Sequence, residues 1–123
     1  MDNLFKSDNV LLDKVLKFAA RIVRLESYLK NQKKEYTISK QIIRSATSIG
    51  ANAYEAVCGI SRSDFNSKLQ ISLKEASETE YWIKLLFLSG YLTESESISL
   101  LTDCLEIKKI LISTLNTSKQ NAD

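Results

Sequence analysis

Apolar side chains recur at intervals of three and four residues in four separate segments of the chain. An α-helix turns once about every 3.6 residues. Side chains three and four residues apart therefore lie on one face of a helix. The first two segments carry Leu11, Val15, Phe18, Ile22, Leu25 and Leu29, then Ile38, Ile42, Ala46, Ile49, Ala53 and Val57. The other two carry Phe65, Leu69, Leu73, Ala76, Ile83 and Phe87, then Leu100, Leu101, Cys104, Leu105, Ile107, Leu111, Ile112 and Leu115. We predict helices over residues 8–31, 38–58, 63–89 and 94–117.

Polar residues and glycines mark the ends of these segments. Thr93-Glu94-Ser95-Glu96 is a capping box, in which the first and last side chains each accept a hydrogen bond from the other residue's backbone. The other expected caps are Ser7 or Asp8, Thr37 or Ser39, and Ser61 or Ser63 at the N-termini, with Gly59 and Gly90 as stops. No segment alternates apolar and polar residues at length, so we expect no sheet. Four helices with short connections predict one all-α domain over residues 1–123, an antiparallel up-down-up-down four-helix bundle.

The residue types that are missing restrict the chemistry. There is no histidine, so Ser-His-Asp and Cys-His arrangements, imidazole bases and every histidine-containing zinc site are excluded. The two cysteines, Cys58 and Cys104, are too few for a four-thiolate metal site. We therefore expect a protein that is not an enzyme, with no catalytic residues, no cofactor and no metal.

The charge is small but unevenly distributed. The net charge is +2, whereas residues 1–60 alone carry +4 and residues 61–123 carry −2, which predicts one basic face or two halves that attract each other. Residues 1–6 lack the basic start and apolar run of a secretory signal, and the apolar run at residues 81–88 is far too short to cross a bilayer. With two unclustered cysteines, these features predict a cytoplasmic protein with no membrane partner.

Cations of the first predicted helix form a basic stripe beside its apolar face. The basic stripe consists of Lys14, Lys17, Arg21 and Arg24, and its charge is extended past the helix end by Lys30, Lys33 and Lys34. A row of cations can displace the counterions of a nucleic-acid backbone, so we interpret the stripe as a phosphate-binding surface for RNA or DNA. The alternative is a solvated flank whose aliphatic stems cover the edge of the core.

The second predicted helix carries a polar row at intervals of three and four residues. The polar row consists of Gln41, Arg44, Ser48, Asn52 and Glu55, and the third predicted helix offers Glu75, Glu78 and Glu80 as partners. Paired carboxylates can serve acid–base catalysis, but no acid–base partner of another type and no metal-ligand spacing accompanies them. We interpret the row as a structural polar network in which Arg44 meets one of the glutamates, such as Glu78, and fixes the register of the helices.

Residues 81–88, with the sequence YWIKLLFL, are apolar around almost the whole helix. A helix of a monomeric bundle buries one face, so Trp82, Leu85 and Leu88 would remain exposed. Because exposed apolar patches mark interaction surfaces, we predict an oligomer with these three residues at its interface. The alternative is that two neighbouring helices of the same chain cover the segment.

The stretch QIIRSATSIGANAYE, residues 41–55, resembles the signature of the small four-helix proteins encoded within 23S ribosomal RNA intervening sequences. The matching positions are Gln41, Arg44, Ala46, Ser48, Ile49, Asn52 and Glu55, followed by a Ser-Arg-Ser-Asp-Phe entry to the third helix at residues 61–65. Gly50 replaces the usual proline, and Ile43 replaces a second arginine. The resemblance spans about residues 10–115, and that family is similar in turn to the accessory variability proteins of diversity-generating retroelements.

The resemblance implies a four-helix protomer that assembles into a ring, typically a homopentamer, without enzymatic activity. It also implies nucleic-acid binding for some members and contact with a reverse transcriptase for the retroelement relatives. The leading hypothesis is a non-enzymatic, homo-oligomeric four-helix bundle that binds RNA or DNA through the basic stripe with Lys33 and Lys34. The alternative is a protein–protein scaffold ring that binds no nucleic acid and partners a reverse transcriptase or another protein.

Overall fold

The computed structural model describes residues 2–5 and 7–121 and contains no strand within these ranges. The helices are α1 (Asp2–Phe5), α2 (Val10–Lys33), α3 (Ile38–Val57), α4 (Arg62–Leu88) and α5 (Glu94–Gln120). The predicted all-α class is confirmed. The four long helices differ from the predicted ones by at most three residues at either end.

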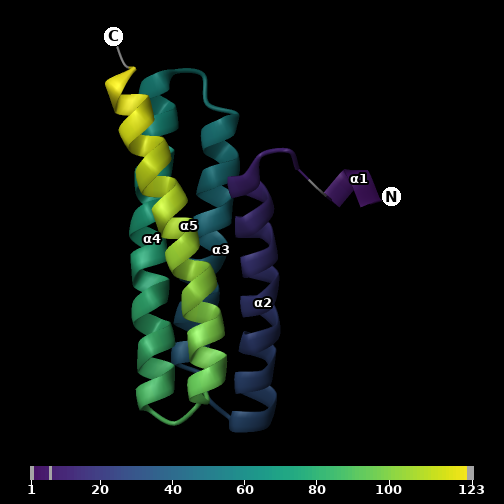
Figure 1. The fold of residues 1–123 in the computed structure, drawn as a ribbon. Helices are drawn as coiled ribbons and strands as arrows, with labels where there is room; N and C mark the ends of the chain where they lie inside the picture. The colour runs from purple at the N-terminus through teal and green to yellow at the C-terminus, as the bar shows by residue number, and fades with distance from the viewer. Residues whose placement is uncertain (1, 6, 122–123) are drawn as a thin grey trace.

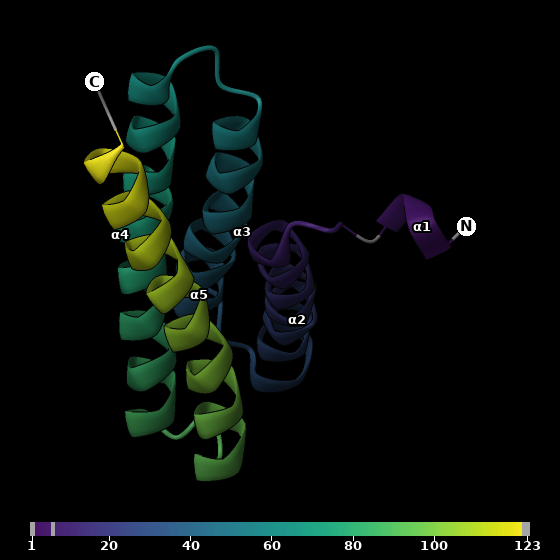
Figure 2. The same ribbon diagram turned by 45° about the horizontal axis from the view of Figure 1, so that its top comes forward.

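The four long helices run in alternating directions and pack side by side, which confirms the up-down-up-down bundle (Figure 1). α3 packs extensively against α2 and α4, and α5 packs against α4, whereas the contact between α2 and α5 is smaller. In both views α5 leans away from α2 toward the end of the bundle that holds the C-terminus (Figure 1 and Figure 2). The α2–α5 side is therefore the most open side of the bundle.

The core is built from the apolar faces of the four long helices. Its fully buried side chains include Phe18, Ile22, Ile42, Ile49, Leu69, Ile83, Ile107 and Leu111. Each such side chain contributes about 1.5–3 kcal/mol relative to an exposed position, so the core is the main source of stability. Four members of the predicted apolar sets are exposed instead, because they lie at helix ends or on the outer side of α5: Val57, Phe87, Leu105 and Ile112. None of the helices in the described ranges is long and apolar enough to span a membrane.

The capping box predicted at Thr93 and Glu96 is confirmed at the start of α5. The Thr93 hydroxyl accepts a hydrogen bond from the Glu96 backbone N–H (3.1 Å), and Glu96 Oε1 accepts one from the Thr93 backbone N–H (2.8 Å). Ser61 caps α4 by accepting from the backbone N–H of Asp64 (3.0 Å). Gly90 has a φ of 86°, the left-handed conformation that commonly ends a helix, and it follows the last turn of α4.

The N-cap of α2 lies one residue later than predicted. Asn9, and neither Ser7 nor Asp8, accepts a hydrogen bond from the backbone N–H of Leu12 (3.1 Å). The Ser7 hydroxyl instead accepts from the backbone N–H of Asn9 (3.0 Å), so it fixes the segment that enters the helix.

The N-terminus of α3 is held by a carboxylate that the sequence analysis did not single out. Thr37 occupies the N-cap position but makes no side-chain capping bond, which corrects the prediction of Thr37 or Ser39 as the cap. The buried Glu35 carboxylate accepts from the backbone N–H groups of Thr37 (3.2 Å) and Ser39 (2.8 Å). A negative charge at this position also interacts favourably with the helix dipole.

Candidate nucleic-acid interface

The basic stripe borders α5, and α5 supplies carboxylates to two of its four cations. Lys14 Nζ lies 2.8 Å from Glu106 Oε1, and Arg21 Nη1 lies 2.6 Å from Asp103 Oδ2. The hydrogen bond with Glu106 raises the pKa of Lys14 above its usual value. These two ion pairs connect the helices on the most open side of the bundle.

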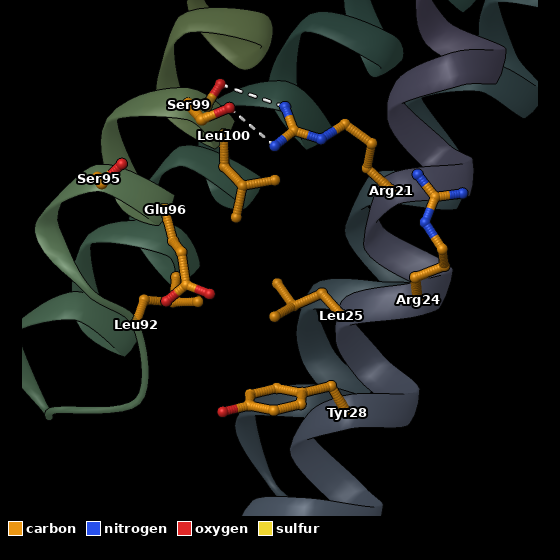
Figure 3. A pocket seen from close by; sticks show the side chains of 9 residues that line it. All are labelled: Arg21, Arg24, Leu25, Tyr28, Leu92, Ser95, Glu96, Ser99 and Leu100. Atoms are coloured by element: carbon orange, nitrogen blue, oxygen red, sulfur yellow. Dashed lines mark hydrogen bonds between the residues drawn. The ribbon is translucent and has the colours of Figure 1, made fainter.

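Arg21 forms more hydrogen bonds than the other cations of the stripe, and Figure 3 shows those that it makes with Ser99. Besides Asp103, its Nη1 donates to the backbone carbonyl of Ser99 (3.3 Å), and its Nη2 donates to the Ser99 hydroxyl (2.9 Å). Several bonds from one planar guanidinium fix its orientation. Because Arg21 and Asp103 both remain partly exposed to water, the pair contributes at most about 1 kcal/mol to stability.

The remaining cations of this region differ in their surroundings. Lys17 pairs with Asp13 within α2, at 2.8 Å. Arg24, Lys33 and Lys34 are exposed and form no ion pair with any residue in the described ranges. We refer to these three residues as the unpaired cations.

A cleft of about 420 Å³ opens between α2 and α5 (Figure 3). Its lining combines three leucines with polar side chains from both helices: Arg21, Arg24, Leu25, Tyr28, Leu92, Ser95, Glu96, Ser99 and Leu100. Leu92 and Leu100 are buried and Leu25 is half-buried, so the floor of the cleft is apolar. One of the unpaired cations, Arg24, is on its α2 wall.

Tyr28 and Glu96 extend into this cleft from opposite helices (Figure 3). The Tyr28 side chain is 41% exposed, and Lys33 Nζ lies 5.9 Å from the centroid of its ring, within the range of a cation–π interaction. Hydrogen bonds from Thr93, with a smaller effect of the Lys33 charge, lower the pKa of Glu96. Glu96 is therefore a carboxylate at neutral pH and can only accept hydrogen bonds.

Arg44 of the polar row bonds with two carboxylates of α4. Its Nη1 lies 3.1 Å from Glu75 Oε2, and its Nη2 contacts Glu78 Oε2. Glu78 Oε2 also accepts a hydrogen bond from Trp82 Nε1 (2.9 Å), and Gln41 Oε1 accepts one from Arg44 Nε (3.3 Å). The structure thus brings these five side chains together and joins α3 to α4 through them.

The other members of the polar row lie apart from this network. Asn52 Nδ2 donates to the backbone carbonyl (2.9 Å) and the hydroxyl (3.0 Å) of Ser48. Glu55 pairs with Lys68 of α4 at 3.0 Å. The row therefore forms three local groups of contacts along α3 rather than one continuous network.

Glu80 connects α4 to α5. It pairs with Lys108 of α5 and with Lys84 of its own helix, each at 2.8 Å. The hydrogen bond from Lys108, followed by that from Lys84, lowers the pKa of Glu80 below its usual value. Glu80 therefore stabilises the bundle as a carboxylate.

The three residues predicted at an oligomer interface differ in exposure. Leu88 is 79% exposed, whereas Trp82 and Leu85 are half-buried. Trp82 packs against the core and meets Tyr81 edge to face, with 4.8 Å between the ring centroids. Tyr81 and Leu88 therefore present the largest apolar areas of this segment to solvent.

The two cysteines occupy unlike positions. Cys104 is buried, its thiol donates a hydrogen bond to the Ala76 backbone carbonyl (3.3 Å), and burial raises its pKa to about 12. Cys58 is exposed. Among the residues that the structure describes, no group of three or more Asp, Glu or Cys side chains is placed to hold a metal ion.

Sequence reasoning missed the partners that α5 offers to the basic stripe, two carboxylates and a serine, although the sequence contains a signal for them. Ser99, Asp103 and Glu106 are spaced four and three residues apart, the same periodicity that defines the stripe. Two such rows on antiparallel helices can face each other. Tyr28 and Glu96 had no comparable signal, since only the packing of α2 on α5 places both at one cleft.

Two comparisons with known proteins give matches over most of the chain. The model of the family described as 23S rRNA-intervening sequence protein matches residues 7–113. A crystal structure from Bacteroides thetaiotaomicron has 53% sequence identity and a TM-score of 0.85, covering 86% of this chain and 98% of that chain. It is described as a protein with unknown function from the S23 ribosomal protein family. No curated protein matches the sequence.

Proposed function

The chain belongs to the family of 23S rRNA-intervening sequence proteins, and on this premise we propose that it is a non-enzymatic bundle that binds RNA or DNA phosphates through α2. The phosphate contacts are the unpaired cations Arg24, Lys33 and Lys34. Neither the family description nor that of the Bacteroides protein names an enzymatic activity. Because the family name refers to ribosomal RNA, RNA is the first ligand to test.

The observation that carries the proposal is the charge of α2. This helix contains six Lys and Arg residues against two Asp and Glu residues, and Lys34 follows directly after it. Arg24, Lys33 and Lys34 have no carboxylate partner in the described ranges, so a phosphate would not have to displace one. Neutralising phosphates with such cations releases counterions, which favours binding at low salt.

Lys14 and Arg21 have a different role in this proposal. Each already pairs with a carboxylate of α5, and Arg21 has further bonds to Ser99. A phosphate that recruited either cation would have to replace these bonds and leave a carboxylate without its partner. We therefore assign Lys14 and Arg21 to the α2–α5 connection, and Lys17, which pairs within α2, to a secondary phosphate contact.

The experiment compares two variants that lose the same charge. The first is Arg24→Gln, Lys33→Gln and Lys34→Asn, where asparagine suits the left-handed φ of 55° at position 34. The control is Lys74→Gln, Lys109→Gln and Lys119→Gln, three exposed cations of α4 and α5 that form no ion pair in the described ranges.

Binding is measured by the fluorescence anisotropy of a labelled single-stranded RNA at about 100 mM salt. We expect the α2 variant to bind about tenfold or more weakly than the native chain and the control to stay close to it. Equal weakening by both variants would mean that binding follows net charge alone. That result would reject α2 as the site.

A second candidate function is self-assembly through the outer face of α4. The observation that favours it is the exposure of Leu88, 79%, beside Tyr81 and the half-buried Trp82 and Leu85. In this proposal the copies form a ring, and the family resemblance suggests five subunits. Light scattering on a size-exclusion column gives the mass directly. We expect an oligomer, and Leu88→Ser should weaken its assembly. The control Ile60→Ser, on the exposed α3–α4 connection, should leave assembly unchanged. A monomer at micromolar concentration would refute the proposal.

A further inference from the structure

We propose that the cleft between α2 and α5 binds one unpaired guanine base of a single-stranded nucleic acid. The inference rests on the proposed function, because the strand that delivers the base is held by the unpaired cations. Arg24 belongs both to those cations and to the α2 wall of the cleft, so it can bind a phosphate next to the inserted base (Figure 3). The cleft thereby adds a base preference to an otherwise sequence-independent surface.

The size and lining of the cleft suit a flat aromatic ligand. Its volume of about 420 Å³ lies within the range of about 300–1,000 Å³ that small-molecule sites occupy. Leu25, Leu92 and Leu100 give it an apolar floor, and the exposed ring of Tyr28 lies beside them. Unpaired bases commonly stack on aromatic side chains in this way.

Glu96 on the opposite wall selects the base. Its Oε1 accepts one backbone N–H, from Thr93 at 2.8 Å, and a carboxylate can accept further hydrogen bonds beyond that one. Guanine places two donors side by side on its Watson–Crick edge, N1–H and the N2 amino group. A carboxylate can accept from both, and hydrogen bonds to a charged group are stronger than neutral ones.

The other bases match this wall less well. Adenine and cytosine place a ring-nitrogen acceptor next to their amino group, and uracil flanks its single N3–H with two carbonyl oxygens. Each of these acceptors would be held against the negative charge of Glu96. A guanine in a duplex has its Watson–Crick edge occupied by cytosine, so the cleft requires an unpaired base.

The test uses labelled RNAs of uridine with one central position changed. One oligonucleotide carries guanosine there, a second carries inosine, which lacks the N2 amino group, and a third carries adenosine. We expect the guanosine RNA to bind about tenfold more tightly than the inosine RNA, the effect of one hydrogen bond to a charged group. Binding of the same three sequences as DNA shows whether the cleft requires a ribose. Binding of guanosine monophosphate shows whether the base must be part of a longer strand.

Two variants connect the preference to the named side chains. Glu96→Gln keeps the capping box, because glutamine serves there as well as glutamate, and should remove the preference for guanosine over inosine. Because the substitution also removes a negative charge that interacts with Lys33, the affinity for the all-uridine RNA is measured in parallel, and the ratio of guanosine to inosine affinity tests the site. Tyr28→Ala should lower the affinity for the guanosine RNA about tenfold, whereas Tyr28→Phe, which keeps the aromatic ring, should leave it unchanged.

The outcomes separate this inference from the function on which it rests. If the RNAs bind but guanosine and inosine bind equally, the cleft has no guanine site and phosphate binding by α2 stands. A preference for guanosine that survives Glu96→Gln would also overturn the inference. If no RNA or DNA binds even at low salt, both the inference and the proposed function are wrong.

Discussion

Arg21 and Asp103 are 82 residues apart in the sequence, yet their side chains meet at 2.6 Å between α2 and α5. Together with Lys14 and Glu106 this pair connects the two helices that pack least extensively among neighbours in the bundle. Arg21 could otherwise bind a phosphate, but here it stabilises the contact between α2 and α5. Because Lys14 and Arg21 are paired in this way, the main candidates for phosphate contacts are the unpaired cations.

Asp103→Asn should release Arg21 and change two properties in opposite directions. The free energy of unfolding should fall by at most about 1 kcal/mol, because the lost ion pair is partly exposed. RNA affinity should rise, because Arg21 becomes available to a phosphate. Urea denaturation and anisotropy measure the two effects. Glu55→Gln removes one negative charge from α3 and serves as the control, and an equal gain in affinity there would contradict the role assigned to Asp103.

Glu80 should make stability depend on acid pH. Its pKa in the folded chain is lowered from the usual 4.5 by Lys108 and Lys84, so its stabilising effect is complete above the unfolded-state pKa. The effect is lost as the pH falls through the lower, folded-state pKa. The difference in unfolding free energy between the native chain and Glu80→Gln should therefore shrink between about pH 5 and pH 3. A difference that is constant over this interval would show that Glu80 gains nothing from its two lysines.

Gly50→Ala should stabilise the protein by about 1 kcal/mol. Glycine inside a helix costs about that much relative to alanine, and Gly50 lies within α3. A Cβ added there would lie 3.6 Å from the nearest atoms of Val15 on α2, an ordinary van der Waals distance. Thermal unfolding measures the change. The control Gly90→Ala should instead destabilise the protein, because the φ of 86° at that position disfavours alanine. A loss of stability in Gly50→Ala would show that α2 cannot accommodate the added methyl group.

The two thiols should react at very different rates. Cys104 is buried and its pKa is raised to about 12, so almost none of it is thiolate near pH 8, whereas Cys58 is exposed. Mass spectrometry after iodoacetamide treatment should find one modified cysteine in the folded chain and two in the denatured chain. Rapid double modification of the folded chain would mean that the core around Cys104 opens readily.

The helices and their apolar faces could be predicted from the sequence because helical periodicity depends on local spacing alone. The capping box of Thr93 and Glu96 is local in the same sense, and the structure contains it. The cap of α3 was harder to predict, because Glu35 lies before the N-cap and reaches forward to Thr37 and Ser39. The spacing of apolar and polar residues gives no sign that the Glu35 carboxylate caps α3.

The candidate site depends on contacts between helices, which spacing within one helix does not encode. The periodicity of the basic stripe treats Arg21 and Arg24 alike, but α5 pairs with Arg21, whereas Arg24 forms no ion pair with the residues that the structure describes. The same limit applies to residues 81–88, where the sequence pattern does not distinguish the half-buried Trp82 from the exposed Leu88. Burial there follows from how α4 packs against its neighbours.

The central claim is that a few cations of α2 bind nucleic-acid phosphates, and the salt dependence of RNA affinity tests it most directly. For single strands the slope of log affinity against log salt is about −0.7 for each phosphate neutralised, so the three unpaired cations predict a slope of about −2. The variant Arg24→Gln, Lys33→Gln, Lys34→Asn should have a much shallower slope, with at most the secondary contact of Lys17 remaining, about −0.7. An affinity that does not change between about 50 and 200 mM salt, or a slope that the variant leaves unchanged, would contradict the claim.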